Sequence, residues 1–139
     1  MLIHELSLQN FRCFESKQIV FAPQFNVVIG DNGVGKTAVL DALSVAISTF
    51  LLGIDRHTAR GIRRSDVRQV TNLNRDIPTN ELTFPVRVHC NGIVSNREIE
   101  WGRSLLGSGR RTTQKDAKDL TGIAEDLQRQ VRNHPPRPI

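Results

Sequence analysis

The residues from Gly30 to Thr37 are the part of this sequence whose types and spacing could do chemistry. They fit the P-loop pattern G-x-x-x-x-G-K-[ST]. In such a loop the glycines let successive backbone amides turn toward anionic oxygens, and the following helix adds the positive end of its dipole. The pattern therefore predicts a site for a nucleotide polyphosphate with Mg²⁺. The predicted site residues are Gly30, Asp31, Asn32, Gly33, Val34, Gly35, Lys36 and Thr37.

Three side chains of this loop have separate expected roles. Lys36 supplies a mobile positive charge for the outer phosphates. The Thr37 hydroxyl is a ligand for Mg²⁺, which would keep several waters and take further oxygens from the nucleotide. The Asn32 amide could donate to the terminal phosphate. The alternative is a glycine loop of purely structural use, although such turns rarely carry Lys-Thr at a helix start by accident.

A P-loop must follow a buried strand and open a helix, and the flanking sequence predicts both. Residues 25–29 read FNVVI, a continuous apolar run that is typical of a strand buried on both faces of a parallel sheet. After Lys36, apolar residues recur at three- and four-residue steps as far as Leu51. That period indicates a helix with a wide apolar face, which Gly53 is placed to end.

The regions on either side of this core are less regular. Residues 2–8 alternate in polarity and residues 18–21 are rich in β-formers, so the two predict a strand hairpin before the loop. Residues 53–81 read as an Arg-rich loop, with a short helix from Ser65 as a candidate because its hydroxyl could cap one.

The last third of the chain predicts a hairpin and a helix. Residues 82–111 contain two β-rich runs, 82–90 and 93–101, which we expect to be joined by a turn at Asn91-Gly92. Residues 113–133 place Leu120, Ile123, Ala124, Leu127 and Val131 on one helical face.

Composition restricts the class of protein. A chain of 139 residues has room for one domain. The net charge of +5 lies in the second part, because residues 53–139 hold sixteen basic and ten acidic side chains, against three and four in residues 1–52. That asymmetry permits a phosphate-rich partner without requiring one. No apolar run reaches the roughly eighteen residues of a membrane span. A secretory signal and a disulfide framework are also poorly supported, so we expect a cytoplasmic protein.

Two stretches, LSLQNFRCFESKQIVF and FNVVIGDNGVGKTAVLDAL, resemble the N-terminal part of the ABC-type ATPase heads of the SMC and RecF-like group. That group opens with a strand, an N-F-[RK] turn, a second strand and a GxNGxGK[ST] loop followed by a Leu-Asp-Ala-Leu helix. The resemblance implies ATP as the nucleotide and places Asn10 and Arg12 of the turn near it; the alternative is a solvent-exposed turn. The stretch GIRRSDVR, and later EIEWGRSL and TTQKDAKDL, look like a narrower set of predicted bacterial RecF-like ATP-binding proteins, several from defence or virulence-associated loci.

The fold class that the resemblance implies for residues 1–139 is α/β. It is an incomplete P-loop NTPase head with parallel core strands, an attached antiparallel β-subdomain and flanking helices. In the family, hydrolysis also needs an apolar strand ending in Asp-Glu and an LSGG-type signature. No apolar strand here ends that way; Glu125-Asp126 falls within a helical pattern, and Leu105–Gly109 has the signature residues in the wrong order. We therefore expect ATP binding, no catalytic residue in this chain, and no hydrolysis by this chain alone.

The expected partners follow from the same resemblance. They are a second copy of the chain or the remainder of a larger ATPase, with DNA as a further candidate and no membrane. A core sheet short of strands would expose an edge, which predicts marginal stability or self-association. The five arginines from Arg56 to Arg68 are a solvated loop by default. The alternative function is an Arg-rich nucleic-acid-binding or regulatory interaction module with a vestigial P-loop. Trp101 is expected to pack across strands rather than to stack on a base.

Overall fold

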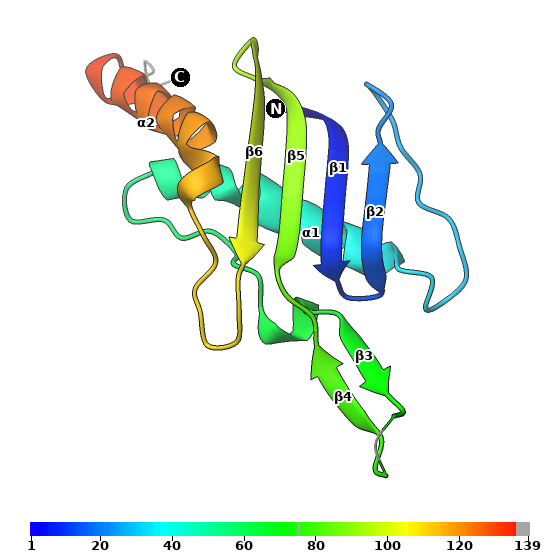
Figure 1. The fold of residues 1–139 in the computed structure, drawn as a ribbon. Helices are drawn as coiled ribbons and strands as arrows, with labels where there is room; N and C mark the ends of the chain where they lie inside the picture. Colours follow the sequence, from blue (N-terminus) through cyan, green and yellow to red (C-terminus); the bar gives the residue numbers. More distant parts are fainter. Residues whose placement is uncertain (75, 136–139) are drawn as a thin grey trace.

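The centre of the fold is a four-stranded antiparallel sheet (Figure 1). The computed structural model describes residues 1–74 and 76–135. The strands of the sheet, in spatial order, are β2 (Phe14–Val20), β1 (Leu2–Phe11), β5 (Val86–Val94) and β6 (Arg97–Leu105). Because side chains alternate along a strand, Leu6 and Leu8 of β1 point to the buried face. The predicted hairpin of the first two strands is therefore present, with a turn at Arg12–Cys13.

Helix α1 (Lys36–Ser48) lies across the buried face of this sheet (Figure 1). Its sheet-facing residues are small, Ala38, Val39, Ala42, Val45 and Ala46, so the helix can approach the strands closely. Trp101 of β6 fills the space beneath it and donates its indole N–H to the Ala46 carbonyl at 3.0 Å. The chain then continues as a 3₁₀ turn, Thr49–Gly53. The helix predicted after Lys36 is thus confirmed, with a tightened last turn.

Helix α2 (Lys118–Asn133) packs against that 3₁₀ turn and against β6. Its buried residues are Leu120, Ile123 and Ala124, which lie on the predicted apolar face. Gly53 makes the close packing possible, because a Cβ there would collide with the Thr121 carbonyl oxygen. The helix begins later than the predicted residue 113, after a 3₁₀ turn at Lys115–Ala117.

The hairpin of β5 and β6 is present, but its predicted turn is wrong. The chain reverses at Ser95 and Asn96, both in the left-handed region with φ of 51° and 62°. Gly92 instead lies within β5, where a Cβ would collide with the Leu2 carbonyl oxygen of the neighbouring β1. An Asn-Gly pair favours a tight turn locally, but here the glycine provides room for a neighbouring strand.

Residues 53–81 are not simply a loop. A 3₁₀ turn at Arg64–Asp66 stands at the place of the expected short helix. A second hairpin follows, made of β3 (Gln69–Asn72) and β4 (Thr79–Leu82), and it projects beyond the end of the main sheet in Figure 1. The strands QVTN and TNEL are too short and too polar to show a two-residue period, so no sequence pattern predicts them.

The expected buried parallel strand at residues 25–29 is not formed. This segment is unpaired, and Phe25, Val27 and Ile29 are 80%, 62% and 87% exposed. All strand pairs among the described residues are antiparallel. An apolar run becomes a buried parallel strand only when neighbouring strands supply hydrogen bonds on its edges, and no described segment lies in that place.

One helical segment contradicts the expectation that no apolar run reaches the length of a membrane span. The 18 residues Lys36–Gly53 have a mean hydropathy of 1.4, enough by length and composition for a membrane span. Core helices of globular proteins pass the same test. In this fold the small residues of α1 are buried against the sheet, which is the packing of a core helix.

Candidate phosphate-binding site

The predicted phosphate loop leads directly into α1. Gly35 precedes the first helical residue in the left-handed region at φ 97°, and Gly33 has φ 90°. Both conformations strain residues that carry a Cβ, so the two glycines have a conformational reason to be there. No side chain caps the helix, and its first turn holds no acidic residue. The N-terminus of α1 therefore keeps its positive character in an exposed loop.

The Lys36 side chain folds back across this loop. Its ammonium group donates a hydrogen bond to the Gly30 carbonyl, six residues back along the chain. A Cβ on Gly30 would stand 2.6 Å from Cγ2 of Val34, so the beginning and the middle of the loop are in close contact. The Val34 N–H completes the closure with a long bond to the Asp31 carbonyl at 3.4 Å. The positive charge is thus held at the mouth of the loop and does not extend into solvent.

The turn between β1 and β2 lies against the same loop. A Cβ built on Gly35 would stand 2.9 Å from the Cys13 sulfur and 2.5 Å from the Phe14 ring. The first strand hairpin therefore forms one wall of the loop, although the two segments are more than twenty residues apart in sequence.

Asn10 lies near the end of β1 and Arg12 in the turn that follows it, and the two side chains have different partners. Each takes a positive φ of 51°, and each side chain contacts protein. Asn10 donates its amide to the Pro85 carbonyl at 2.9 Å, which ties β1 to the start of β5. Arg12 forms ion pairs with Asp41 of α1 at 2.7 Å and with Asp66 at 2.9 Å. The alternative of a solvent-exposed turn is wrong for Arg12; the predicted nucleotide contacts of both residues stay predictions.

Arg60 and Asp66 have partners that were not expected from the sequence. Both lie in the stretch interpreted as a solvated arginine loop, yet the Asp66 side chain is fully buried and that of Arg60 is only 15% exposed. Arg60 pairs with Asp66 at 3.3 Å and with Asp41 at 3.4 Å. The available signal was a single acid, Asp66, within a basic run.

The other candidate residues discussed from the sequence lie away from the phosphate loop or have a packing role. Trp101 is 1% exposed, so the interpretation as a packing residue is confirmed. Glu125 and Asp126 lie on the exposed side of α2, as expected. The stretch after Leu105 is a turn, which agrees with rejecting it as a signature helix. Within the described residues, no group of three or more His, Cys, Asp or Glu side chains could hold a metal ion.

Two buried groups have shifted pKa values. Burial raises the pKa of the Cys90 thiol to about 12, because the thiolate would lose its hydration. Burial likewise lowers the pKa of Arg103, whose side chain donates to the Thr113 carbonyl and to the Thr49 hydroxyl. Neither group lies at the phosphate loop.

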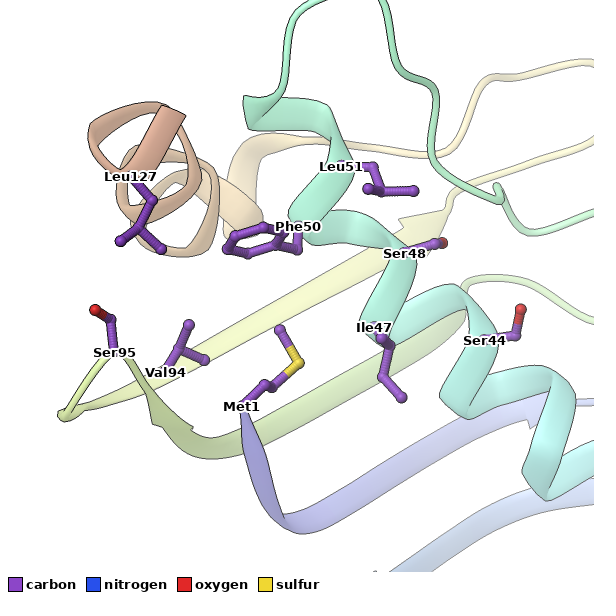
Figure 2. A pocket seen from close by; sticks show the side chains of 9 residues that line it. All are labelled: Met1, Ser44, Ile47, Ser48, Phe50, Leu51, Val94, Ser95 and Leu127. Carbon is purple, nitrogen blue, oxygen red and sulfur yellow. The ribbon is translucent and has the colours of Figure 1, made fainter. Parts of the chain in front are cut away.

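A hollow of about 660 Å³ lies at the far end of α1 (Figure 2). Its walls are mainly apolar and come from α1, the 3₁₀ turn, α2 and the β5–β6 turn. The lining residues are Met1, Ser44, Ile47, Ser48, Phe50, Leu51, Val94, Ser95 and Leu127. It lacks positive side chains, so its chemistry does not suit a polyphosphate.

Comparison with known proteins places this geometry in a family. The family described as AAA domain matches residues 5–135. The DNA replication and repair protein RecF of Pseudarthrobacter chlorophenolicus is 29% identical over 130 residues, which are 91% of this chain and 29% of that protein. The DNA double-strand break repair Rad50 ATPase of Sulfolobus acidocaldarius is 35% identical over 66 residues, 48% of this chain and 7% of that protein.

A solved structure supports the same fold. It is described as "Structural biochemistry of ATP-driven dimerization and DNA stimulated activation of SMC ATPases", and it superposes with a TM-score of 0.55 at 20% identity. The match covers 89% of this chain and 80% of that one. The chain spans less than a third of the length of the RecF and Rad50 relatives. The predicted α/β fold of an ATPase head fragment is therefore confirmed, and the chain belongs to the AAA domain family.

Proposed function

We propose that this chain is the Mg-ATP-binding lobe of a RecF/SMC-like ATPase. The phosphates would lie against the loop Gly30–Thr37, where Lys36 neutralises the outer oxygens and the uncapped start of α1 adds backbone donors. Thr37 is exposed in the first turn of that helix and carries the hydroxyl that would bind Mg²⁺. Bound Mg²⁺ would offset the negative charge of the phosphates.

One observation carries the proposal. The Lys36 ammonium is folded back over its own loop, onto the Gly30 carbonyl, beside two glycines in the left-handed region. A lysine that served only solubility or only packing of its stem would keep its ammonium group in water. In this loop the cation instead has a backbone carbonyl as its partner, which leaves its charge for an anion.

Binding without hydrolysis is the activity that we propose for this chain by itself. Phosphoryl transfer depends on positioned charges and on a residue that orients the attacking water. No apolar run in these residues ends in an acidic pair, so water activation would have to come from outside them. The LSGG-type signature of the family would equally be supplied elsewhere.

The test is calorimetric titration of the 139-residue chain with Mg-ATP. We expect measurable binding by the wild type and none by Lys36→Ala, with unchanged circular dichroism. Thr37→Ala should keep ATP binding in EDTA but lose the Mg²⁺-dependent part of the affinity. Lys118→Ala, at the exposed start of α2, is the matched control for loss of one lysine. Equal affinity in wild type and Lys36→Ala would refute the proposal.

The exposed apolar surface suggests the partner of this lobe. The unpaired segment 25–29 lies at the surface together with Leu40 and Ile47 of α1, which are 59% and 48% exposed. Burial of such residues is worth about 25 cal/mol per Å², so this face favours association. We propose that it is covered by the rest of an ATPase head or by a second copy, in a cytoplasmic protein that acts in DNA repair or phage defence.

Nucleic acid is a second candidate ligand, favoured by one specific observation. Two neighbouring loops carry four exposed arginines: Arg63, Arg64, Arg110 and Arg111. The loops are joined where the Ile62 N–H donates to the Thr112 hydroxyl at 2.8 Å, and Arg64 and Arg110 line one hollow of about 420 Å³. None of the four guanidinium groups forms an ion pair within the described residues, so their charge is available to a phosphate backbone.

This second candidate is tested by retardation of duplex DNA in a gel. We expect Arg63→Ala/Arg64→Ala to weaken retardation. The slope of the logarithm of the binding constant against the logarithm of the salt concentration should fall by about two, since each phosphate contact contributes about one. Arg129→Ala/Arg132→Ala on α2 is the control for loss of two exposed arginines. Absence of retardation by the wild type at low salt would dismiss the candidate.

A further inference from the structure

Asp66 is a buried carboxylate with an unusually complete set of donors. It accepts from Arg12 Nε at 3.1 Å and Nη2 at 2.9 Å. It also accepts from Arg60 Nη2 at 3.3 Å and from the Arg63 backbone N–H at 2.9 Å. A buried carboxylate is costly without such partners, so these contacts offset the cost of burying the Asp66 side chain. Asp66 therefore fixes two guanidinium groups at once.

The same two arginines reach the helix that follows the phosphate loop. Arg12 Nη2 lies 2.7 Å from Oδ2 of Asp41, and Arg60 Nη1 donates to the Asp41 carbonyl at 2.7 Å. Asp41 stands four residues after Thr37 and so lies on the same side of α1, one turn on. The charged cluster thus connects the β1–β2 turn, the start of α1 and the 3₁₀ turn Arg64–Asp66.

Arg12 retains donor capacity for a ligand. Its Nε and Nη2 atoms are engaged by Asp66 and Asp41, whereas its Nη1 atom has no partner among the described residues. The side chain is 29% exposed, and the next residue, Cys13, packs against Gly35 of the loop. A guanidinium held rigidly on one edge can offer the other edge to an anion without losing rotamer entropy on binding.

We infer that Asp66 is a positioning residue that holds the Arg12 guanidinium for the phosphates of the nucleotide bound at Gly30–Thr37. The inference rests on the proposed function, because it assigns an additional donor to the same site. Asp66 acts through Arg12 and does not touch the nucleotide. Asp41 of α1 forms an ion pair with the same Arg12 guanidinium. Arg60 forms ion pairs with both Asp41 and Asp66.

A purely structural cluster makes a different prediction. If the four charges only join three segments, changes in Asp66 lower the free energy of unfolding but leave the affinity of the folded molecule for Mg-ATP unchanged. If Asp66 positions Arg12, the affinity itself falls, and it falls through the same interaction that Arg12→Ala removes. A double-mutant cycle separates these cases.

The experiment titrates Mg-ATP into folded wild type, Arg12→Ala, Asp66→Asn and the double variant, with folding checked by circular dichroism. We expect each single variant to bind about tenfold more weakly, the loss of one hydrogen bond to a charged group, and the double variant to bind no more weakly than Arg12→Ala. Asp126→Asn, in an exposed pair with Arg129, is the charge-matched control.

Wild-type affinity in folded Asp66→Asn, or losses that multiply in the double variant, would overturn the inference. Should Asp66→Asn fail to fold, Arg12→Lys serves instead, because lysine keeps the charge but cannot offer two edges. We expect the same tenfold loss, and wild-type affinity in Arg12→Lys would overturn the inference. Equal Mg-ATP binding by wild type and Lys36→Ala would instead refute the proposed function, and with it the positioning role of Asp66.

Discussion

Phe14 lies so close to Gly35 that a Cβ atom on the glycine would stand 2.5 Å from the Cζ atom of the ring. The aromatic ring belongs to the first strand hairpin and the glycine to the phosphate loop. Since Gly35 also has a φ of 97°, both its conformation and its neighbour exclude a side chain.

Gly35→Ala should therefore destabilise the protein and distort the loop. We expect a loss of about 1–3 kcal/mol in the free energy of unfolding, from backbone strain and displacement of Phe14. Urea denaturation measures it. Gly122→Ala is the matched control, since nothing lies within 4 Å of a Cβ at this position of α2. That variant should gain about 0.5–1 kcal/mol, and an equal effect of both substitutions would contradict the prediction.

Trp101 should report on the core, as the single tryptophan of the chain. It is 1% exposed and bonded to the Ala46 carbonyl, so its emission should be blue-shifted when folded and should move to the red on unfolding. Trp101→Phe should lose about 1–3 kcal/mol of stability, from the lost bond and the cavity left behind. If the wild type retards DNA, Trp101→Phe should retard it equally. A loss of DNA binding in folded Trp101→Phe would indicate that Trp101 stacks on a base.

The two cysteines should differ in reactivity. Cys13 is exposed, whereas the pKa of buried Cys90 is raised to about 12 from an ordinary 9.0. A thiol reagent at pH 8 should label one cysteine per folded chain and two in denaturant, because the thiolate reacts. Labelling of Cys13→Ser at the wild-type rate would contradict this assignment.

The same shift predicts loss of stability in alkali. The folded-state pKa of Cys90 lies above its unfolded value, so the folded protein binds the thiol proton more tightly. Its contribution to stability is therefore complete below about pH 9 and falls as the pH rises from there toward 12. Urea midpoints measured from pH 8 upward should fall less steeply in Cys90→Ala than in the wild type.

The outer face of α1 should drive self-association. Leu40 and Ile47 are exposed there, next to the unpaired apolar segment 25–29. We expect Leu40→Ser/Ile47→Ser to lower the sedimentation-average mass relative to the wild type, while Val131→Ser on α2, also 59% exposed, should not. A wild type that stays monomeric as its concentration is raised would show that this face does not associate by itself.

Local sequence determined the elements whose signals are contiguous. The P-loop pattern, the three- and four-residue period of α1, the alternation of β1 and the apolar stripe of α2 all reflect neighbours within one or two turns. These signals also carried the family resemblance of residues 1–52, which comparison with known proteins confirms. The nucleotide contacts of the loop remain predictions, because a pattern indicates chemistry without showing a ligand.

Tertiary structure decided the rest, since it depends on segments far apart in the chain. The turn between β5 and β6 lies at Ser95-Asn96 and not at the predicted Asn91-Gly92, because β1 occupies the space beside Gly92. Asp66 became a buried clamp because Arg12, 54 residues earlier, reaches it. The segment 25–29 stayed unpaired because an apolar run forms a strand only where another strand lies alongside it. Periodicity records which face of an element is apolar; which element covers that face, and which charges meet there, is settled only by long-range packing.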